Sequence, residues 1–245
     1  MKKRYKWLIG TFLVLFSIFL IALLVIRQLT YAPRSSNLAI LALDHVEDHG
    51  HAVVLHPESD VKATIVFYPG GFVEPESYLL LANALTFKDY RVIVVRMPLN
   101  LAILGINRAN DVLEWVEGPL ILAGHSLGGA SAAFYVDRHR DLVDGLILMA
   151  AYPADSIDLK DLPLAVLSIQ ADQDAIIDQE ALEQTKAQLP PHTVFETIEG
   201  GDHAGFGAYG DQRGDGQASI SRDAQRGLIV ELIESWFYHT IGGTS

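Results

Sequence analysis

The sequence predicts an α/β fold in which a mostly parallel sheet is flanked by helices, and three observations predict it. Short runs rich in Val, Ile and Leu alternate with helical patterns along the chain. Several of these runs are apolar almost throughout, as expected for strands that are covered on both faces. The 245 residues, half of them hydrophobic, suffice for one sizeable core. We therefore expect a single folded domain at residues 31–245, preceded by a separate segment at residues 1–30.

The expected elements follow from these patterns in chain order. Strands are predicted at residues 52–56, 64–68, 91–96, 120–123, 145–149, 164–169 and 194–198. Helices are predicted at residues 76–87, 108–116, 128–137, 179–189 and about 221–239. Asp178 is expected to be the N-cap of the fourth helix. Residues 32–37 are expected to be a polar connection, and the Gly- and Asp-rich stretch 205–216 a loop.

Residues 7–26 form an apolar run that is long enough to span a bilayer as a helix. Lysine and arginine are concentrated before this run, which predicts a cytoplasmic N-terminus and places the domain outside the cytoplasm. A cleaved signal peptide is the alternative, but its apolar core is usually about 7–15 residues. Cleavage after Ala32 would leave Pro33 following the cut, which is unfavourable. We therefore expect a single-pass protein of the cell membrane, with a transmembrane anchor within residues 1–30.

Composition excludes several classes of function. The formal net charge of −12 opposes binding to nucleic acids, which are themselves anionic. The absence of cysteine excludes disulfides, thiolate metal sites and a cysteine nucleophile. The clustered histidines 45, 49, 51 and 56 lack the spacing of a known metal site, and a solvated hairpin is expected there. No metal and no cofactor are expected.

Ser126 is the predicted nucleophile, because it is the central residue of a Gly-His-Ser-Leu-Gly segment at 124–128. An apolar strand precedes the segment and a helix rich in small residues follows it. A serine on such a turn projects its hydroxyl outward, and the flanking glycines allow the backbone to pack closely. The alternative is an ordinary glycine-rich turn between a strand and a helix.

A serine hydroxyl needs a general base, and the base needs a carboxylate that orients it. His203 follows the last predicted strand and is the expected base. Asp172 and Asp174 both follow the strand before it, and either could be the acid. The carboxyl ends of parallel strands meet at one edge, so these loops are expected beside Ser126. Asp202, next to the base, is expected to be a solvated loop residue.

Together these segments resemble the α/β-hydrolase superfamily over about residues 38–240. The resemblance rests on Tyr-Pro-Gly-Gly-Phe at 68–72, the serine turn, the loop of Asp174 and the segment 201–207. The last segment is similar to that of dienelactone-hydrolase-like enzymes. Those enzymes use a cysteine nucleophile, so their substrate is not carried over to this chain. In the family the acid commonly lies three residues after a glycine. Ala171 stands in that place here, which implies Asp174 as the acid and leaves Asp172 as the alternative.

The resemblance also implies backbone N–H donors for the oxyanion of a tetrahedral intermediate. Leu127 is expected to supply one of these donors. The other is expected from the turn after the strand 64–68, with Gly71 as the first choice and Phe72 as the second.

The expected function is that of a serine hydrolase that cleaves an ester-like bond, in a carboxylic ester, thioester or lactone, through an acyl-enzyme. The expected partners are a small-molecule acyl substrate and the membrane. Only residues 150–163 are available for a lid, so the site is expected to be open, although residues 205–218 could cover it. An acyltransferase with the same triad and a non-catalytic binding module that kept the fold are the alternatives.

Overall fold

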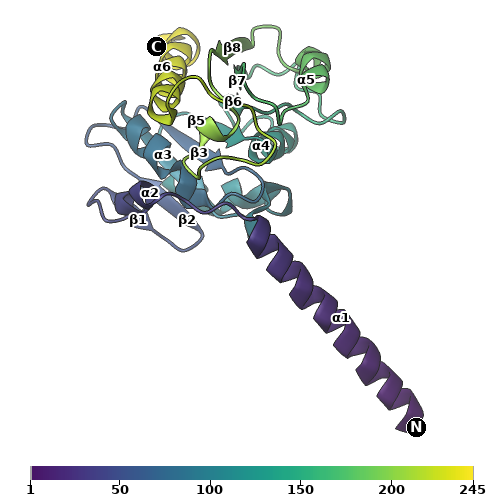
Figure 1. The fold of residues 1–245 in the computed structure, drawn as a ribbon. Helices are drawn as coiled ribbons and strands as arrows, with labels where there is room; N and C mark the ends of the chain where they lie inside the picture. Colours follow the sequence, from purple (N-terminus) through teal and green to yellow (C-terminus); the bar gives the residue numbers. More distant parts are fainter. Residues whose placement is uncertain (1, 245) are drawn as a thin grey trace.

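An eight-stranded sheet forms the centre of the computed structural model, which describes residues 2–244 (Figure 1). The strands are β1 (Val46–Asp48), β2 (Ala52–Leu55), β3 (Ala63–Tyr68), β4 (Tyr90–Val95), β5 (Leu120–His125), β6 (Gly145–Met149), β7 (Ala165–Ala171) and β8 (Val194–Ile198). Their order in the sheet is β1-β2-β4-β3-β5-β6-β7-β8. The pairs β1–β2 and β2–β4 are antiparallel, and all other neighbours are parallel. The predicted α/β fold is therefore confirmed.

Helices cover both faces of the sheet. The α-helices are α1 (Lys2–Leu29), α2 (Ser35–Ile40), α3 (Leu79–Thr86), α4 (Leu127–Arg138), α5 (Gln179–Thr185) and α6 (Arg222–Thr240). The 3₁₀ segments are η1 (Pro75–Tyr78), η2 (Pro98–Asn100), η3 (Ala102–Leu104), η4 (Ile106–Trp115), η5 (Lys186–Gln188), η6 (Ala204–Phe206) and η7 (Gly242–Thr244). Helices α3 and α6 pack on one face and α4 on the other (Figure 1).

Alternating side chains of the central strands fill two separate apolar clusters. Ile65 and Phe67 of β3 belong to the cluster under α3 and α6, whereas Val66 and Tyr68 belong to the cluster under α4. Every residue of β3 and β5 is buried. Because a strand turns successive side chains to opposite faces, burial on both faces demands a continuous apolar run, as observed.

The seven predicted strands are all present within one or two residues of the expected bounds. The hairpin expected around the clustered histidines is also confirmed, since β1 pairs antiparallel with β2. Asp178 caps α5 as expected, because its carboxylate accepts the amides of Glu180 and Ala181.

The helix predicted at residues 108–116 is wrong, because this stretch is the 3₁₀ segment η4. The Tyr68 hydroxyl enters its first turn, where it accepts the Ala109 amide at 3.0 Å and donates to the Ile106 carbonyl at 2.5 Å. These backbone groups therefore bond to a side chain of the sheet instead of completing an α-helical turn.

The connection at residues 32–37 is not wholly irregular, because α2 begins within it at Ser35. Asn37 is fully buried there, although asparagine is usually exposed. Its side-chain amide donates to the Ala208 carbonyl at 2.9 Å and its oxygen accepts the Leu80 amide at 3.2 Å. These two bonds fasten α2 to the domain, and the sequence pattern did not indicate them.

Helix α1 projects away from the domain (Figure 1). Its stretch Trp7–Leu29 is 23 residues long, and none of it is buried against the rest of the chain. A helix of this length and composition could cross a membrane or serve as a signal sequence.

Candidate active site

Ser126 lies on the sharp turn between β5 and α4. Its backbone has φ 53° and ψ −123°, a region that non-glycine residues rarely adopt. The Ser126 amide donates to the Met149 carbonyl of β6 at 2.9 Å, which holds the turn in place. A Cβ added to Gly124 would lie 2.4 Å from the Gly128 carbonyl carbon, and one added to Gly128 would lie 2.1 Å from the Tyr68 carbonyl oxygen. Only glycine at both positions allows α4 to pack this closely on the sheet.

Gly124→Ala is therefore expected to destabilise the domain. The added methyl group meets backbone that cannot move independently of α4, and overpacking of this kind costs about 1–3 kcal/mol or more. Thermal unfolding monitored by circular dichroism measures the effect. Gly227→Ala is the matched control, because a Cβ there meets nothing within 4 Å and alanine favours the helix interior. Equal melting temperatures for Gly124→Ala and the wild type would contradict the packing argument.

His203 and Asp174 are brought together by the loops that follow β8 and β7. His203 Nδ1 lies 2.7 Å from Asp174 Oδ2, and both side chains are almost completely buried. The other carboxylate oxygen of Asp174 accepts the amides of Ile176 and Ile177 at 2.8 and 3.0 Å. These amides fix the carboxylate, so that it can hold the imidazole in one orientation.

Asp172 faces a different group. Its Oδ1 accepts the Gly200 amide at 2.7 Å and thereby ties the end of β7 to the turn after β8. Of the two candidate acids, the structure places Asp174 next to His203 and Asp172 at the Gly200 amide.

Ser126 and His203 line one cavity of about 350 Å³ at the carboxyl edge of the sheet. Within residues 2–244 their side chains are not hydrogen-bonded to each other, and contacts of this kind often shorten only when substrate binds. Apolar side chains of α4 and of the loop after β6 form much of the wall, and Tyr152 and Ile176 also line it. Residues 205–218 do not line the cavity, so they do not cover it.

The amide of Leu127 is the first of α4 and makes no hydrogen bond among the described residues. Gly71 lies beside it, since a Cβ on Gly71 would be 3.1 Å from Leu127 Cδ2. The Phe72 amide, in contrast, donates to the Asn100 carbonyl at 2.7 Å. Phe72 is thus not a free donor here, which leaves Gly71 and Leu127 as the pair that could face an oxyanion.

Asp202 is buried, contrary to the expectation of a solvated residue. Its Oδ1 accepts the Gly205 amide at 2.7 Å and lies 3.3 Å from the Arg222 guanidinium. Burial raises the pKa of the Asp202 carboxyl, and the charge of Arg222 opposes this shift. Local sequence patterns do not indicate this pair, because Arg222 lies on α6, 20 residues away from Asp202.

Asp215 is a second carboxylate that the sequence pattern left unassigned. It accepts the amides of His203 at 3.3 Å, Ala204 at 2.8 Å and Ala175 at 3.4 Å. It therefore joins the backbone at the candidate base to the loop that carries Asp174. Gly216 permits this approach, because a Cβ there would lie 1.8 Å from the Gln173 carbonyl oxygen.

His125 lies beneath the candidate base, with 4.6 Å between the ring centroids of His125 and His203. Its Nδ1 bonds to the Tyr78 hydroxyl at 2.8 Å, and that hydroxyl accepts the Gly70 amide at 3.0 Å. Burial holds the pKa of His125 well below its usual value, and the charge of His203 lowers it further, with a small opposing effect from the His203 backbone. His125 is thus neutral near pH 7 and places no fixed positive charge beside the base.

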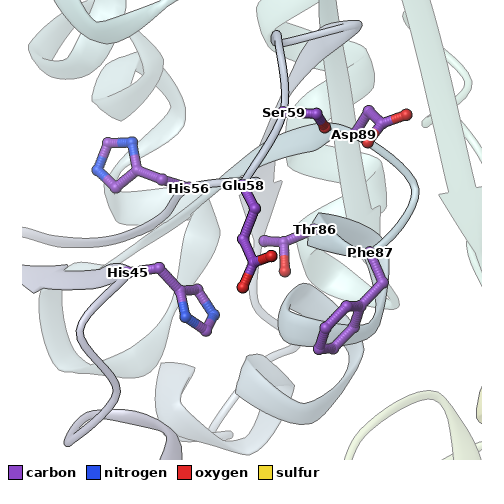
Figure 2. Close-up of a pocket in the computed structure, with 7 residues that line it drawn as sticks. All are labelled: His45, His56, Glu58, Ser59, Thr86, Phe87 and Asp89. Atoms are coloured by element: carbon purple, nitrogen blue, oxygen red, sulfur yellow. Dashed lines mark hydrogen bonds between the residues drawn. The ribbon is translucent and has the colours of Figure 1, made fainter.

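The histidines near the amino end of the domain form no comparable site. His45 and His56 line a separate cavity of about 290 Å³ with Glu58 and Asp89, and Figure 2 shows the two imidazoles well apart. His45 Nε2 bonds to Asn83 at 2.8 Å. Within residues 2–244 no group of three or more His, Asp or Glu side chains is arranged to hold a metal ion.

Comparison with known proteins identifies the family. A family model described as "Alpha/beta hydrolase family" matches residues 64–227, which include the serine turn, Asp174 and His203. The chain belongs to the α/β-hydrolase family. The predicted resemblance is therefore confirmed.

Several solved structures share the fold of this α/β hydrolase. Est1E from Butyrivibrio proteoclasticus superposes with a TM-score of 0.58 at 14% identity, covering 80% of this chain and 98% of Est1E. A dienelactone hydrolase from Anabaena variabilis superposes with a TM-score of 0.60 at 16% identity, and the match covers 80% of this chain and 95% of that enzyme. A monoacylglycerol lipase from Paleococcus ferrophilus superposes with a TM-score of 0.59 at 13% identity, and the match covers 76% of this chain and 99% of the lipase. At these identities the likeness shows the fold alone.

A pyrethroid hydrolase from Sphingobium wenxiniae is 51% identical to this α/β hydrolase over 41 residues. The match spans 17% of this chain and 15% of that protein. It is a local similarity, and the activity of the whole relative does not follow from it.

Proposed function

We propose that the protein is a serine hydrolase that cleaves an ester-like bond in a small-molecule acyl substrate through an acyl-enzyme. One observation carries this proposal: a buried His203–Asp174 pair, 2.7 Å apart, adjoins a cavity that Ser126 also lines. A base with an orienting carboxylate next to a strained serine is the arrangement that acyl transfer requires. In this proposal Ser126 is the nucleophile, His203 is the general base, and Asp174 is the acid that orients His203.

In the proposed reaction, His203 takes the proton of the Ser126 hydroxyl as its oxygen attacks the substrate carbonyl. Asp174 accepts the Nδ1–H of His203, so that the other ring nitrogen faces the serine and the imidazolium is stabilised. The Leu127 and Gly71 amides donate to the oxyanion, each contributing about 3 kcal/mol by the usual mutational measure. His203 then protonates the leaving group, and water releases the acyl group by the reverse proton path.

The substrate class is a carboxylic ester, a thioester or a lactone. The local match to a pyrethroid hydrolase, and the dienelactone hydrolase and monoacylglycerol lipase that share the fold, motivate the choice of ester chemistry. A panel of acyl esters of graded length, with thioesters, amides and lactones alongside, tests this proposal. Adding competing alcohols reveals acyl transfer, because a new ester then forms in place of the free acid.

We also propose that α1 anchors the protein in the cell membrane with the hydrolase domain outside the cytoplasm. Trp7–Leu29 is long and apolar enough to span a bilayer, and the basic residues that precede it favour a cytoplasmic N-terminus.

Protease added to intact spheroplasts is expected to digest the domain, because this topology exposes it outside the membrane. Immunoblotting with tags at both ends measures the result, and a cytoplasmic protein serves as the control that must stay intact. The full-length chain should sediment with membranes. A soluble form that begins near Pro33 would show that the helix is removed as a signal sequence.

A further inference from the structure

Three exposed apolar side chains lie on one short segment after β4, which we call the apolar loop (residues 98–104). Leu99, Ile103 and Leu104 are 46%, 43% and 56% exposed. Single exposed apolar residues are ordinary on protein surfaces, whereas larger contiguous apolar patches mark protein–protein or membrane interaction sites.

The apolar loop is held in one conformation. The Asn100 carbonyl accepts the Phe72 amide at 2.7 Å, and Leu99 and Asn100 both adopt left-handed backbone angles, with φ of 55° and 54°. At its end, a Cβ on Gly105 would lie 2.8 Å from Met97 Sδ, so the chain turns back tightly. Consecutive left-handed residues other than glycine are costly. The three exposed side chains are thus held on a fixed backbone that includes energetically costly conformations.

The apolar loop lies next to the end of α1. Only Thr30 separates α1 from Tyr31, whose amide donates to the Phe72 carbonyl at 2.7 Å and whose carbonyl accepts the Glu74 amide at 3.0 Å. Phe72 therefore has Tyr31 on one side and Asn100 on the other. Two backbone hydrogen bonds through this one residue therefore connect the end of α1 to the apolar loop.

Further contacts fix this end of α1 to the active-site side of the domain. The Tyr31 ring packs against Tyr209, with 5.4 Å between centroids, and its hydroxyl accepts the Arg213 amide at 3.2 Å. The turn after β3, the apolar loop after β4 and Ser126 after β5 all follow parallel strands, so they lie at one edge of the sheet. The anchor thus leaves the domain from the edge that carries the cavity.

We propose that the apolar loop contacts the surface of the bilayer that holds α1, and that the site receives acyl esters of membrane lipids from that leaflet. The proposal rests on the proposed hydrolase function and on α1 as an anchor. Burial of the three side chains in the interface stabilises this contact, since apolar surface is removed from water. The net charge of −12 gives no general attraction to anionic lipids, so the contact depends on these apolar side chains.

A single fluorophore tests the contact without any measurement of activity. The chain has no cysteine, so Leu104→Cys offers one site for an environment-sensitive dye. Phe87→Cys is the matched control, because Phe87 is 71% exposed and precedes β4, at the opposite edge of the sheet. In the full chain reconstituted into phosphatidylcholine vesicles, nitroxide-labelled lipid is expected to quench the dye at 104 by roughly twofold or more and to leave the dye at 87 unchanged. Equal signals at both positions would refute the contact. The contact would also be refuted if the dye at 104 were shielded from aqueous iodide but not quenched by the labelled lipid. That result would indicate contact with a second copy of the chain.

Activity provides the second test. A variant carrying Leu99→Asp, Ile103→Asp and Leu104→Asp is expected to hydrolyse a long-chain lipid ester in vesicles about tenfold more slowly, because charged groups oppose insertion. Its rate on a short water-soluble ester, and the labelling of Ser126 by a fluorophosphonate probe, should match the wild type. The proposal would be overturned if the variant hydrolysed both substrates more slowly to the same extent. It would also be overturned if the rate on the lipid ester in vesicles did not fall. Absence of Ser126 labelling in the wild type would instead count against the hydrolase function, and the dye measurement would still decide the membrane contact.

Discussion

Ser126→Ala is expected to lower turnover by about 10⁶ and to abolish covalent labelling by a fluorophosphonate probe. The variant removes the atom that would form the acyl-enzyme, and no other hydroxyl is held on the strained turn between β5 and α4 in the described structure. Labelling followed by peptide mass spectrometry identifies the modified residue, and steady-state kinetics on a short ester give the loss of turnover.

Ser131→Ala is the matched control for this experiment. Ser131 lies one turn further along α4, is buried, and donates its hydroxyl to the Leu127 carbonyl at 2.8 Å. The substitution removes a hydroxyl from α4 at a position that does not line the cavity, so labelling of Ser126 by the probe should persist. A probe attached to another serine in the wild-type protein would disprove the assignment of Ser126, as would near-normal turnover by Ser126→Ala.

Asp174→Asn is expected to lower kcat by roughly 10⁴. The asparagine oxygen can still accept the Ile176 and Ile177 amides, which leaves its NH₂ group facing His203 Nδ1. That nitrogen must then act as acceptor, so the proton moves to the other ring nitrogen, which can no longer take a proton from Ser126. Steady-state kinetics on a soluble ester measure the effect.

Asp172→Asn should change kcat by less than about tenfold, because the asparagine oxygen can still accept the Gly200 amide. The two variants differ by two positions in one loop and make the same chemical change, so each controls for the other. Melting curves of both must first show that the fold is intact. An inactive Asp172→Asn beside a normal Asp174→Asn would mean that the acid is Asp172.

The sequence by itself determined the sheet and the positions from which the site is built. Continuous apolar runs predicted the buried strands, because a strand covered on both faces has no solvent side on which to place polar residues. The glycines around Ser126 predicted a tight turn, which the backbone angles and the close approach of Gly128 to the sheet now show. These features depend on residues that are near one another in the chain, where local patterns carry the information.

Tertiary structure shows which of the two candidate carboxylates contacts His203. Asp172 and Asp174 follow the same strand, and which carboxylate meets His203 depends on the paths of two loops whose contacts span 29 residues. The same reason explains the other differences. The Asn100 carbonyl accepts the Phe72 amide, the partly exposed Arg222 lies beside the buried Asp202, and the Tyr68 hydroxyl bonds to the backbone of the 3₁₀ segment where an α-helix was expected. In each case the hydrogen-bonding partner comes from a distant part of the chain, so local patterns do not indicate it. A buried polar group must be hydrogen-bonded, and the fold decides which group lies near enough to be its partner.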